Sequence, residues 1–147
     1  MRGKFLTLAS IIIVLLLTIT GCSKKIEHNE VSSYSDQILS SILLALTQSN
    51  YNEFASYLND DMKETFDNEV FEKESRTLID NAGFFESLSF IEGKKNKGYV
   101  SLIYYATFTD EPDGVKISIT FKEEDPEHKV YQLYLSSPKL SEASSKT

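Results

Sequence analysis

The sequence predicts an α+β fold, in which amino-terminal helices pack on a curved antiparallel sheet of about four strands. Apolar residues recur at spacings of three and four from Ser33 to about Ala82, as they do along one face of a helix. After Gly83 the spacing changes to two, which is typical of strands. About 110 residues remain once the two ends are set aside, enough for one domain with one core.

The chain begins with an export signal. Arg2 and Lys4 precede the apolar run from Phe5 to Thr20, and a basic start before an apolar stretch and a small residue is typical of such signals. As a helix this run would span roughly 24 Å, short of the ~30 Å hydrocarbon core of a bilayer. We therefore expect residues 1–21 to be cleaved rather than to remain as a membrane span.

Cys22 is the single cysteine of the chain, and it directly follows Ile19, Thr20 and Gly21. These four residues resemble the lipobox of bacterial lipoprotein signals, in which an aliphatic residue, a small or hydroxyl residue and Gly or Ala precede the cysteine. The resemblance implies transfer of diacylglycerol to the Cys22 sulfur, cleavage before Cys22 and anchoring on the extracytoplasmic face of the cell membrane. A free cysteine and an uncleaved anchor are the alternatives.

The remaining chain is acidic. Its formal charge is −7, and removal of residues 1–21 would take away Arg2 and Lys4 and change it to −9. A nucleic-acid partner needs a basic patch that displaces counterions, so we expect none. Residues 22–32 are polar and predict a flexible tether, and residues 137–147 predict a polar tail.

The predicted domain, residues 33–136, opens with four helical segments. The first is Ser33–Gln48, and Asn50 is placed to cap a short second helix. Asn59 to Asp61 forms the next break, followed by a short third piece. A longer helix covers Asn68–Ala82, with Gly83 where a left-handed C-cap belongs.

Four strands are expected after the helices, at residues 84–92, 99–109, 115–122 and 130–135. Tyr99–Thr109 is the longest, and its alternate apolar residues face one side. The segments Gly93–Gly98, Asp110–Gly114 and Glu123–His128 are predicted turns. The apolar face of the sheet and the apolar stripes of the helices can both be covered only if they pack together.

Three segments carry a family resemblance: Leu46–Phe54, Asp61–Lys63 and Tyr99–Phe108. They resemble the nuclear transport factor 2-like superfamily, and within it a bacterial branch known only as a domain of unknown function, often found behind lipoprotein signals. The resemblance implies a curved sheet that wraps helices into a cone, often with a pocket at its wide end. Enzymes, binding proteins and structural modules share this architecture, so it assigns no function.

Four aromatic residues are the candidates to line such a pocket: Tyr34, Phe54, Tyr104 and Tyr131. The pattern favours the alternative that they fill the core, with the tyrosine hydroxyl groups reaching its rim. The faces assigned to the core include no carboxylate or histidine, and tyrosine, with a pKa near ~10, is a poor general base. The acidic turn Glu123–His128 does not have the spacing of an EF-hand. No cofactor or metal is expected, because no phosphate loop, Cys-x-x-Cys or Ser/His/Asp set is present.

The sequence favours a non-enzymatic, lipid-anchored domain that binds a protein partner or a small apolar ligand. A partner or a second copy of the chain is expected on the outer face of the sheet, where Tyr105 and Thr107 should be exposed. The alternative is a pocket enzyme of the envelope that acts on a small metabolite. A buried Asp, Glu or His at the open end of the cone would favour the enzyme.

Overall fold

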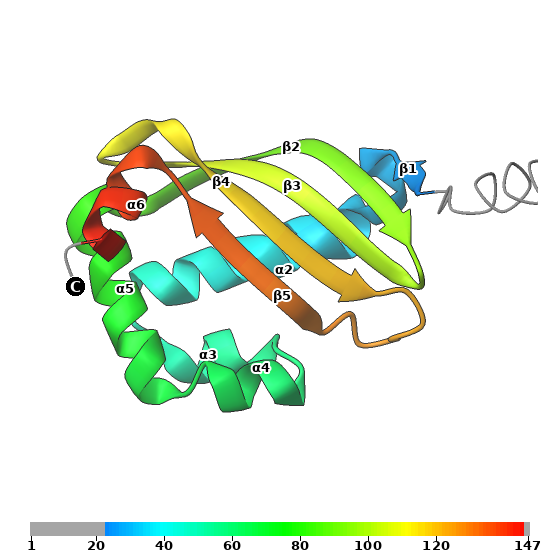
Figure 1. The fold of residues 1–147 in the computed structure, drawn as a ribbon, viewed down its shortest axis with the longest axis horizontal. Coiled ribbons are helices and arrows are strands. Elements are labelled where there is room, and N and C mark those ends of the chain that lie inside the picture. Colours follow the sequence, from blue (N-terminus) through cyan, green and yellow to red (C-terminus); the bar gives the residue numbers. More distant parts are fainter. Residues whose placement is uncertain (1–22, 146–147) are drawn as a thin grey trace, which may run out of the picture.

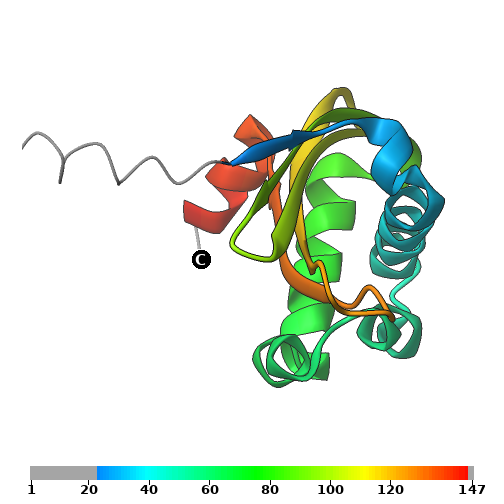
Figure 2. The same cartoon turned by 90° about the vertical axis from the view of Figure 1, so that its right-hand side faces the viewer.

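The computed structural model of the chain describes residues 23–145, so the predicted signal and Cys22 lie outside the described residues. In this range the short strand β1 is followed by four helices, then by four strands and a last helix, and the strands form one antiparallel sheet in chain order, β1-β2-β3-β4-β5. The sheet is a single curved layer with the longer helices on one side (Figures 1 and 2). The predicted α+β class is confirmed, with five strands rather than about four. None of the described helices is both long and apolar enough to cross a bilayer.

The elements follow one another with short connections. In chain order they are β1 (Lys24–Ile26), α2 (His28–Thr47), α3 (Tyr51–Ser56), α4 (Asp60–Thr65), α5 (Asn68–Ala82), β2 (Phe85–Asn96), β3 (Tyr99–Phe108), β4 (Glu111–Lys122), β5 (Val130–Ser136) and α6 (Pro138–Ser145).

Two helix starts, after Asn50 and Asn59, lie where the sequence predicts a cap, and Asp67 caps a third. Asn50, Asn59 and Asp67 precede α3, α4 and α5, and the side-chain oxygen of each accepts a hydrogen bond from the backbone N–H three residues later. Each bond satisfies a donor that a helix start leaves free. Gly83 ends α5 with φ +83° and ψ −144°, a region of backbone conformation that is close to glycine-only.

The core lies between α2 and the inner face of the sheet. Its fully buried side chains include Leu39, Ile42 and Leu43 of α2, Leu102, Tyr104 and Phe108 of β3, and Ile117, Ile119 and Phe121 of β4. Burial of each large apolar side chain contributes about 1.5–3 kcal/mol to folding. The strand faces predicted from the alternation are therefore confirmed for β3 and β4.

Residues 24–32 do not form the flexible tether that the sequence predicts. β1 pairs with β2, and Ile26, opposite Gly93, is 5% exposed. A Cβ at Gly93 would lie 3.2 Å from that of Ile26, so glycine permits this close approach. The helix then starts at His28, because the Glu27 N–H donates to the Glu30 carboxylate at 3.2 Å and the Glu30 N–H donates to the Glu27 carbonyl at 3.0 Å. The first bond is the Glu30 half of a capping box, and the second is a backbone bond of the first helical turn.

The turns are tighter than predicted. Lys97 and Gly98, with φ of 50° and 80°, suffice to join β2 to β3, as in hairpins whose two turn residues have positive φ. β4 begins at Glu111 rather than Val115. The predicted turn residues Pro112 and Gly114 belong instead to a bulge, because β4 has extra residues between the pairs Phe108–Glu111 and Ala106–Val115.

The predicted polar tail is also corrected. Pro138–Ser145 forms α6, and Leu140 on this helix is only 9% exposed. Pro138 is the first residue of the helix, where its missing N–H carries no penalty. A single buried leucine is a weak signal in a segment rich in serine, which is why the sequence indicates a tail.

Candidate functional site

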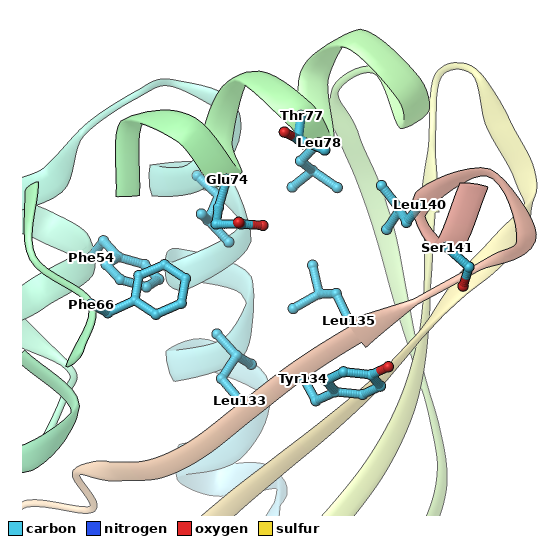
Figure 3. Close-up of a pocket in the computed structure, with 11 residues that line it drawn as sticks. Phe54, Phe66, Glu74, Thr77, Leu78, Leu133, Tyr134, Leu135, Leu140 and Ser141 are labelled. Atoms are coloured by element: carbon cyan, nitrogen blue, oxygen red, sulfur yellow. The ribbon is translucent and has the colours of Figure 1, made fainter. Parts of the chain in front are cut away.

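A cavity of about 420 Å³ lies between α5, β5 and α6 (Figure 3). Its apolar lining consists of Leu46, Phe54, Phe66, Leu78, Leu133, Leu135 and Leu140. Its polar lining consists of Glu74, Thr77, Tyr134 and Ser141. Small-molecule sites of proteins are typically apolar clefts of roughly 300–1,000 Å³ with a few polar groups. The cavity therefore has both the size and the composition of a ligand site.

Local geometry explains which side chains reach the cavity. Glu74 and Leu78 are four residues apart on α5, so they project from the same face of that helix. Leu133 and Leu135 alternate with Tyr134 along β5, and all three line the cavity. Neighbouring residues of a strand point to opposite faces, so the cavity wraps around the edge of β5, the last strand of the sheet.

The polar side chains of the lining differ in what they can still bind. The Thr77 hydroxyl donates to the Lys73 carbonyl at 2.9 Å, and the Ser141 hydroxyl donates to the Ser137 carbonyl at 2.9 Å. The carboxylate of Glu74 has neither an ion-pair nor a hydrogen-bond partner among residues 23–145. Figure 3 shows this carboxylate directed into the cavity. The lining therefore combines apolar side chains with one carboxylate that has no partner among the described residues.

A second cavity, of about 350 Å³, lies between the start of α2 and strands β2 and β3. Here Asp36 accepts a hydrogen bond from the Tyr104 hydroxyl at 2.8 Å. His28 Nε2 lies 2.9 and 3.0 Å from the two carboxylate oxygens of Asp36, and since a carboxylate only accepts, Nε2 carries a proton and donates. The His28 ring stacks on Phe90 at 4.7 Å. The expectation that no carboxylate or histidine lies beside the candidate tyrosines is therefore wrong at Tyr104.

Burial raises the pKa of the Tyr104 hydroxyl well above its ordinary value of 10.0. A hydrogen bond with Ser35 lowers it and the hydrogen bond and charge of Asp36 raise it further, both as smaller effects. The neutral phenol is therefore the stable form, because an anion there would lose its water and face a carboxylate. The Tyr104 hydroxyl donates a hydrogen bond to Asp36 and so links β3 of the sheet to α2.

The four predicted pocket residues do not converge on one site. Phe54 lines the larger cavity and Tyr104 the second one. Tyr34 lines a third cavity of about 300 Å³ and stacks on His128 at 3.9 Å. Burial raises the pKa of Tyr34 as well. Tyr34, near the start of α2, therefore lines a different cavity from Leu46, near the end of the same helix.

Tyr131 lies on the outer face of the sheet rather than in the core. It contacts Tyr99 edge-on, with ring centres 6.0 Å apart, and Tyr99 precedes the inward-facing Val100. The cause is a bulge in β5, since Val130 pairs with Phe121 while the next pair along is Gln132–Thr120. A bulge shifts the alternation of inward and outward side chains by one residue. No residue type in β5 indicates that a bulge is present.

The outer face of the sheet carries both exposed aromatic side chains and paired hydroxyl groups. Tyr105 is 43% exposed, as predicted. The Thr107 hydroxyl, however, pairs with that of Ser87 at 2.7 Å, and Ser101 pairs with Thr120 at 3.0 Å. These hydroxyl pairs add polar groups to the face that carries Tyr105.

Sequence reasoning missed most of the cavity, because its walls come from five helices or helix ends and one strand. A signal existed at Glu74, which shares the apolar stripe of α5 with Phe71 and Leu78. A charged residue within an apolar stripe marks a place where the helix faces something other than packed core. No such signal existed at Leu135 or Leu140, which have the same composition as core residues.

No metal site accompanies either cavity in the described part of the chain. Residues 23–145 contain no group of three or more His, Cys, Asp or Glu side chains arranged to hold an ion. The acidic turn after β4 instead forms local bonds, in which Asp125 accepts from the backbone N–H groups of Glu127 and Lys129.

A comparison with curated proteins finds no match to this chain. A comparison with protein families matches residues 40–133, which is more than half of the chain and includes α3, α4, α5 and most of the sheet. The matching family is described as protein of unknown function (DUF3887). The matched region holds the α5 wall of the larger cavity and Leu133 of β5, and it ends before Tyr134, Leu135 and α6. By this match the chain belongs to the DUF3887 family of uncharacterised domains.

Proposed function

We propose that this protein is a lipid-anchored, extracytoplasmic binding domain, not an enzyme, and that the cavity between α5, β5 and α6 holds a small apolar molecule. The observation that carries the proposal is the cavity itself, about 420 Å³ with seven apolar side chains in its lining. An apolar molecule that moves from water into such walls gains about 25 cal/mol per Å² of surface buried. The resemblance to the nuclear transport factor 2-like superfamily supports the same reading, since a pocket is common there.

The anchoring part of the proposal rests on Ile19-Thr20-Gly21-Cys22. Acyl chains on Cys22 would each contribute about 0.8 kcal/mol per buried CH₂, and two signals are needed for stable attachment. Cys22→Ala should release the protein from membranes or halt its processing. Intact mass and membrane fractionation identical to the unsubstituted protein would reject the anchor.

The binding part can be tested by filling the cavity. Thr77→Trp places a large ring in the lining from a half-buried position on α5, so the fold should survive. The variant should bind the neutral probe 4-phenylbutanol at least about tenfold more weakly, a change of ~1.4 kcal/mol. Binding is measured by ligand-observed NMR on the full lipidated chain in nanodiscs, with the signal of empty nanodiscs subtracted.

The matched control is Lys73→Trp, which adds the same ring at an exposed position of α5 outside the cavity lining. It should bind the probe like the unsubstituted protein. Equal binding by both variants, or no binding by the unsubstituted chain, would reject the cavity as the ligand site.

A pocket enzyme of the envelope is the second candidate, and the His28–Asp36–Tyr104 cluster favours it because it places a carboxylate, an imidazole and a phenol beside one cavity. Each of these groups already has a partner within the cluster, which fits a structural role better than proton transfer. If Asp36→Asn abolished turnover of an envelope metabolite without loss of stability, the enzyme would replace the binding domain.

A further inference from the structure

We infer that the apolar ligand of the larger cavity carries a positively charged, hydrogen-bond-donating group, as an amphiphilic amine does. This inference rests on the proposed function and adds the chemical class of the ligand. It depends on which polar groups line the cavity and on which of their protons and lone pairs are already used.

The single charged side chain of the lining is the carboxylate of Glu74. Lys73 directly precedes Glu74 but lies outside the lining. Arg76 lies 3.7 Å from Glu72, and Lys139 of α6 pairs with Glu111 at 3.0 Å. No lysine or arginine lines the cavity. Within the described residues, the charge of Glu74 is therefore left for a ligand or for water.

The hydroxyl groups of the lining extend this preference. Thr77 and Ser141 each have one proton, and each donates it to a backbone carbonyl of its own helix. What they offer to the cavity is oxygen lone pairs. Together with Glu74 they make the rim rich in acceptors, and Tyr134 is the one lining side chain whose hydroxyl can donate.

An ammonium group has three donors and no acceptor, so it matches this rim. A carboxylate ligand such as a fatty acid would find one side-chain donor in the lining, the Tyr134 hydroxyl, and it would lie near the like charge of Glu74. The net charge of the chain, −7, adds to that repulsion. Charge complementarity thus selects among apolar molecules of similar shape.

The test compares three probes with one apolar part and different heads: 4-phenylbutylammonium, 4-phenylbutanol and 4-phenylbutanoate. They are measured by ligand-observed NMR at neutral pH and low salt on the full lipidated chain in nanodiscs, with empty nanodiscs subtracted. We expect the amine to bind about three to ten times more tightly than the alcohol, since Glu74 is exposed to water on one side. The acid should bind more weakly than the alcohol.

Glu74→Gln should remove the preference for the amine over the alcohol, because the amide keeps the shape of the side chain and loses its charge. The control is Asp80→Asn, which removes the same charge from an exposed position of α5 outside the lining and should keep the preference. An acid that binds as tightly as the amine, or a preference that persists in Glu74→Gln, overturns the inference while the alcohol still reports on the proposed function.

Two other occupants are outcomes of the same experiment. A capped peptide of alternating leucine and alanine that binds where the amine does not would identify a peptide strand on the edge of β5 as the occupant. Sedimentation that shows a dimer which Thr77→Trp disrupts would identify a second copy of the chain. Either result overturns the assignment of an amine.

Discussion

The ammonium group of Lys139 on α6 lies 3.0 Å from Oε2 of Glu111 at the start of β4. The Glu111 side chain is only 8% exposed, and Lys139 also donates to the Asp110 carbonyl. This pair therefore holds α6, and with it the Leu140 wall of the larger cavity, against the sheet. A buried carboxylate depends strongly on its partner, because its hydration has been lost.

Lys139→Ala should consequently reduce the free energy of unfolding by about 1–3 kcal/mol, less than for a fully buried pair because Lys139 is half exposed. It should also weaken binding of 4-phenylbutanol and speed hydrogen exchange in α6. Urea unfolding and hydrogen exchange measure these effects. In Lys63→Ala, whose partner Asp60 is 96% exposed, the loss should stay below about 0.5 kcal/mol. Equal losses in the two variants would contradict the role given to Lys139.

Tyr104 makes the free energy of unfolding depend on pH in the alkaline range. The pKa of its hydroxyl is raised in the folded state, so the neutral form is favoured there. Below pH 10, tyrosine is neutral in both states and this contribution is complete. Above pH 10 the unfolded chain ionises first, and stability falls by about 1.4 kcal/mol per pH unit for each such group.

Tyr104→Phe should therefore reduce the free energy of unfolding by about 1 kcal/mol at neutral pH, because Asp36 and Ser35 lose a hydrogen-bond partner. Above pH 10 the free energy of unfolding of this variant should fall less steeply with pH. Urea unfolding between pH 8 and 11 measures both effects. Tyr105→Phe on the outer face is the control and should keep the alkaline slope of the unsubstituted protein. An unchanged slope in Tyr104→Phe would rule out this linkage.

Gly83 should tolerate no side chain. Its φ is +83°, and a Cβ there would lie 2.1 Å from Thr109 Oγ1 and 2.9 Å from a carboxylate oxygen of Asp110. Gly83→Ala should destabilise the protein by about 2–3 kcal/mol, as measured by thermal or urea unfolding. Gly98→Ala has a similar φ of +80° but open space around it, and should lose only about 1 kcal/mol. If the two losses were equal, the contact with Thr109 would have no effect.

Ile26 tests whether the segment before α2 is part of the domain. It is 5% exposed and paired through β1 with β2, so Ile26→Ala should reduce the free energy of unfolding by about 1–3 kcal/mol. Lys24→Ala on the same strand, at an exposed position, should change it by less than about 0.5 kcal/mol. A flexible tether would instead make both substitutions silent.

Much of the fold could be predicted because the signals were local and repeated. The stripe of α2 and the alternation in β3 and β4 each involve several residues, and Asn50 and Asn59 occupy the predicted cap positions. β1 could not be predicted in this way, since three residues carry no periodicity and their order comes from pairing with a strand some 70 residues later.

The candidate site was much less predictable than the fold. Phe54 was placed correctly in a cavity lining, but Tyr131 was misplaced by a bulge, and Leu135 and Leu140 have no feature that distinguishes a cavity wall from packed core. The His28–Asp36 pair was missed because residue 28 was assigned to the tether. A cavity is the space that the surrounding side chains leave unfilled. It depends on how several helices and strands pack together, so no single segment of the sequence predicts it.

The pairing of β1 also bears on how the proposed anchor would orient the molecule. Lys24 is the second residue after Cys22. At ~3.3–3.6 Å per residue, the segment between a lipid on Cys22 and the start of β1 would span about 7 Å. A domain held this closely would stand with β1 next to the bilayer, where the exposed Lys24 and Lys25 would suit anionic headgroups. Since α6 lies at the far end of the molecule from β1 (Figure 1), the mouth of the cavity would open away from the bilayer, towards solutes arriving from outside the cell.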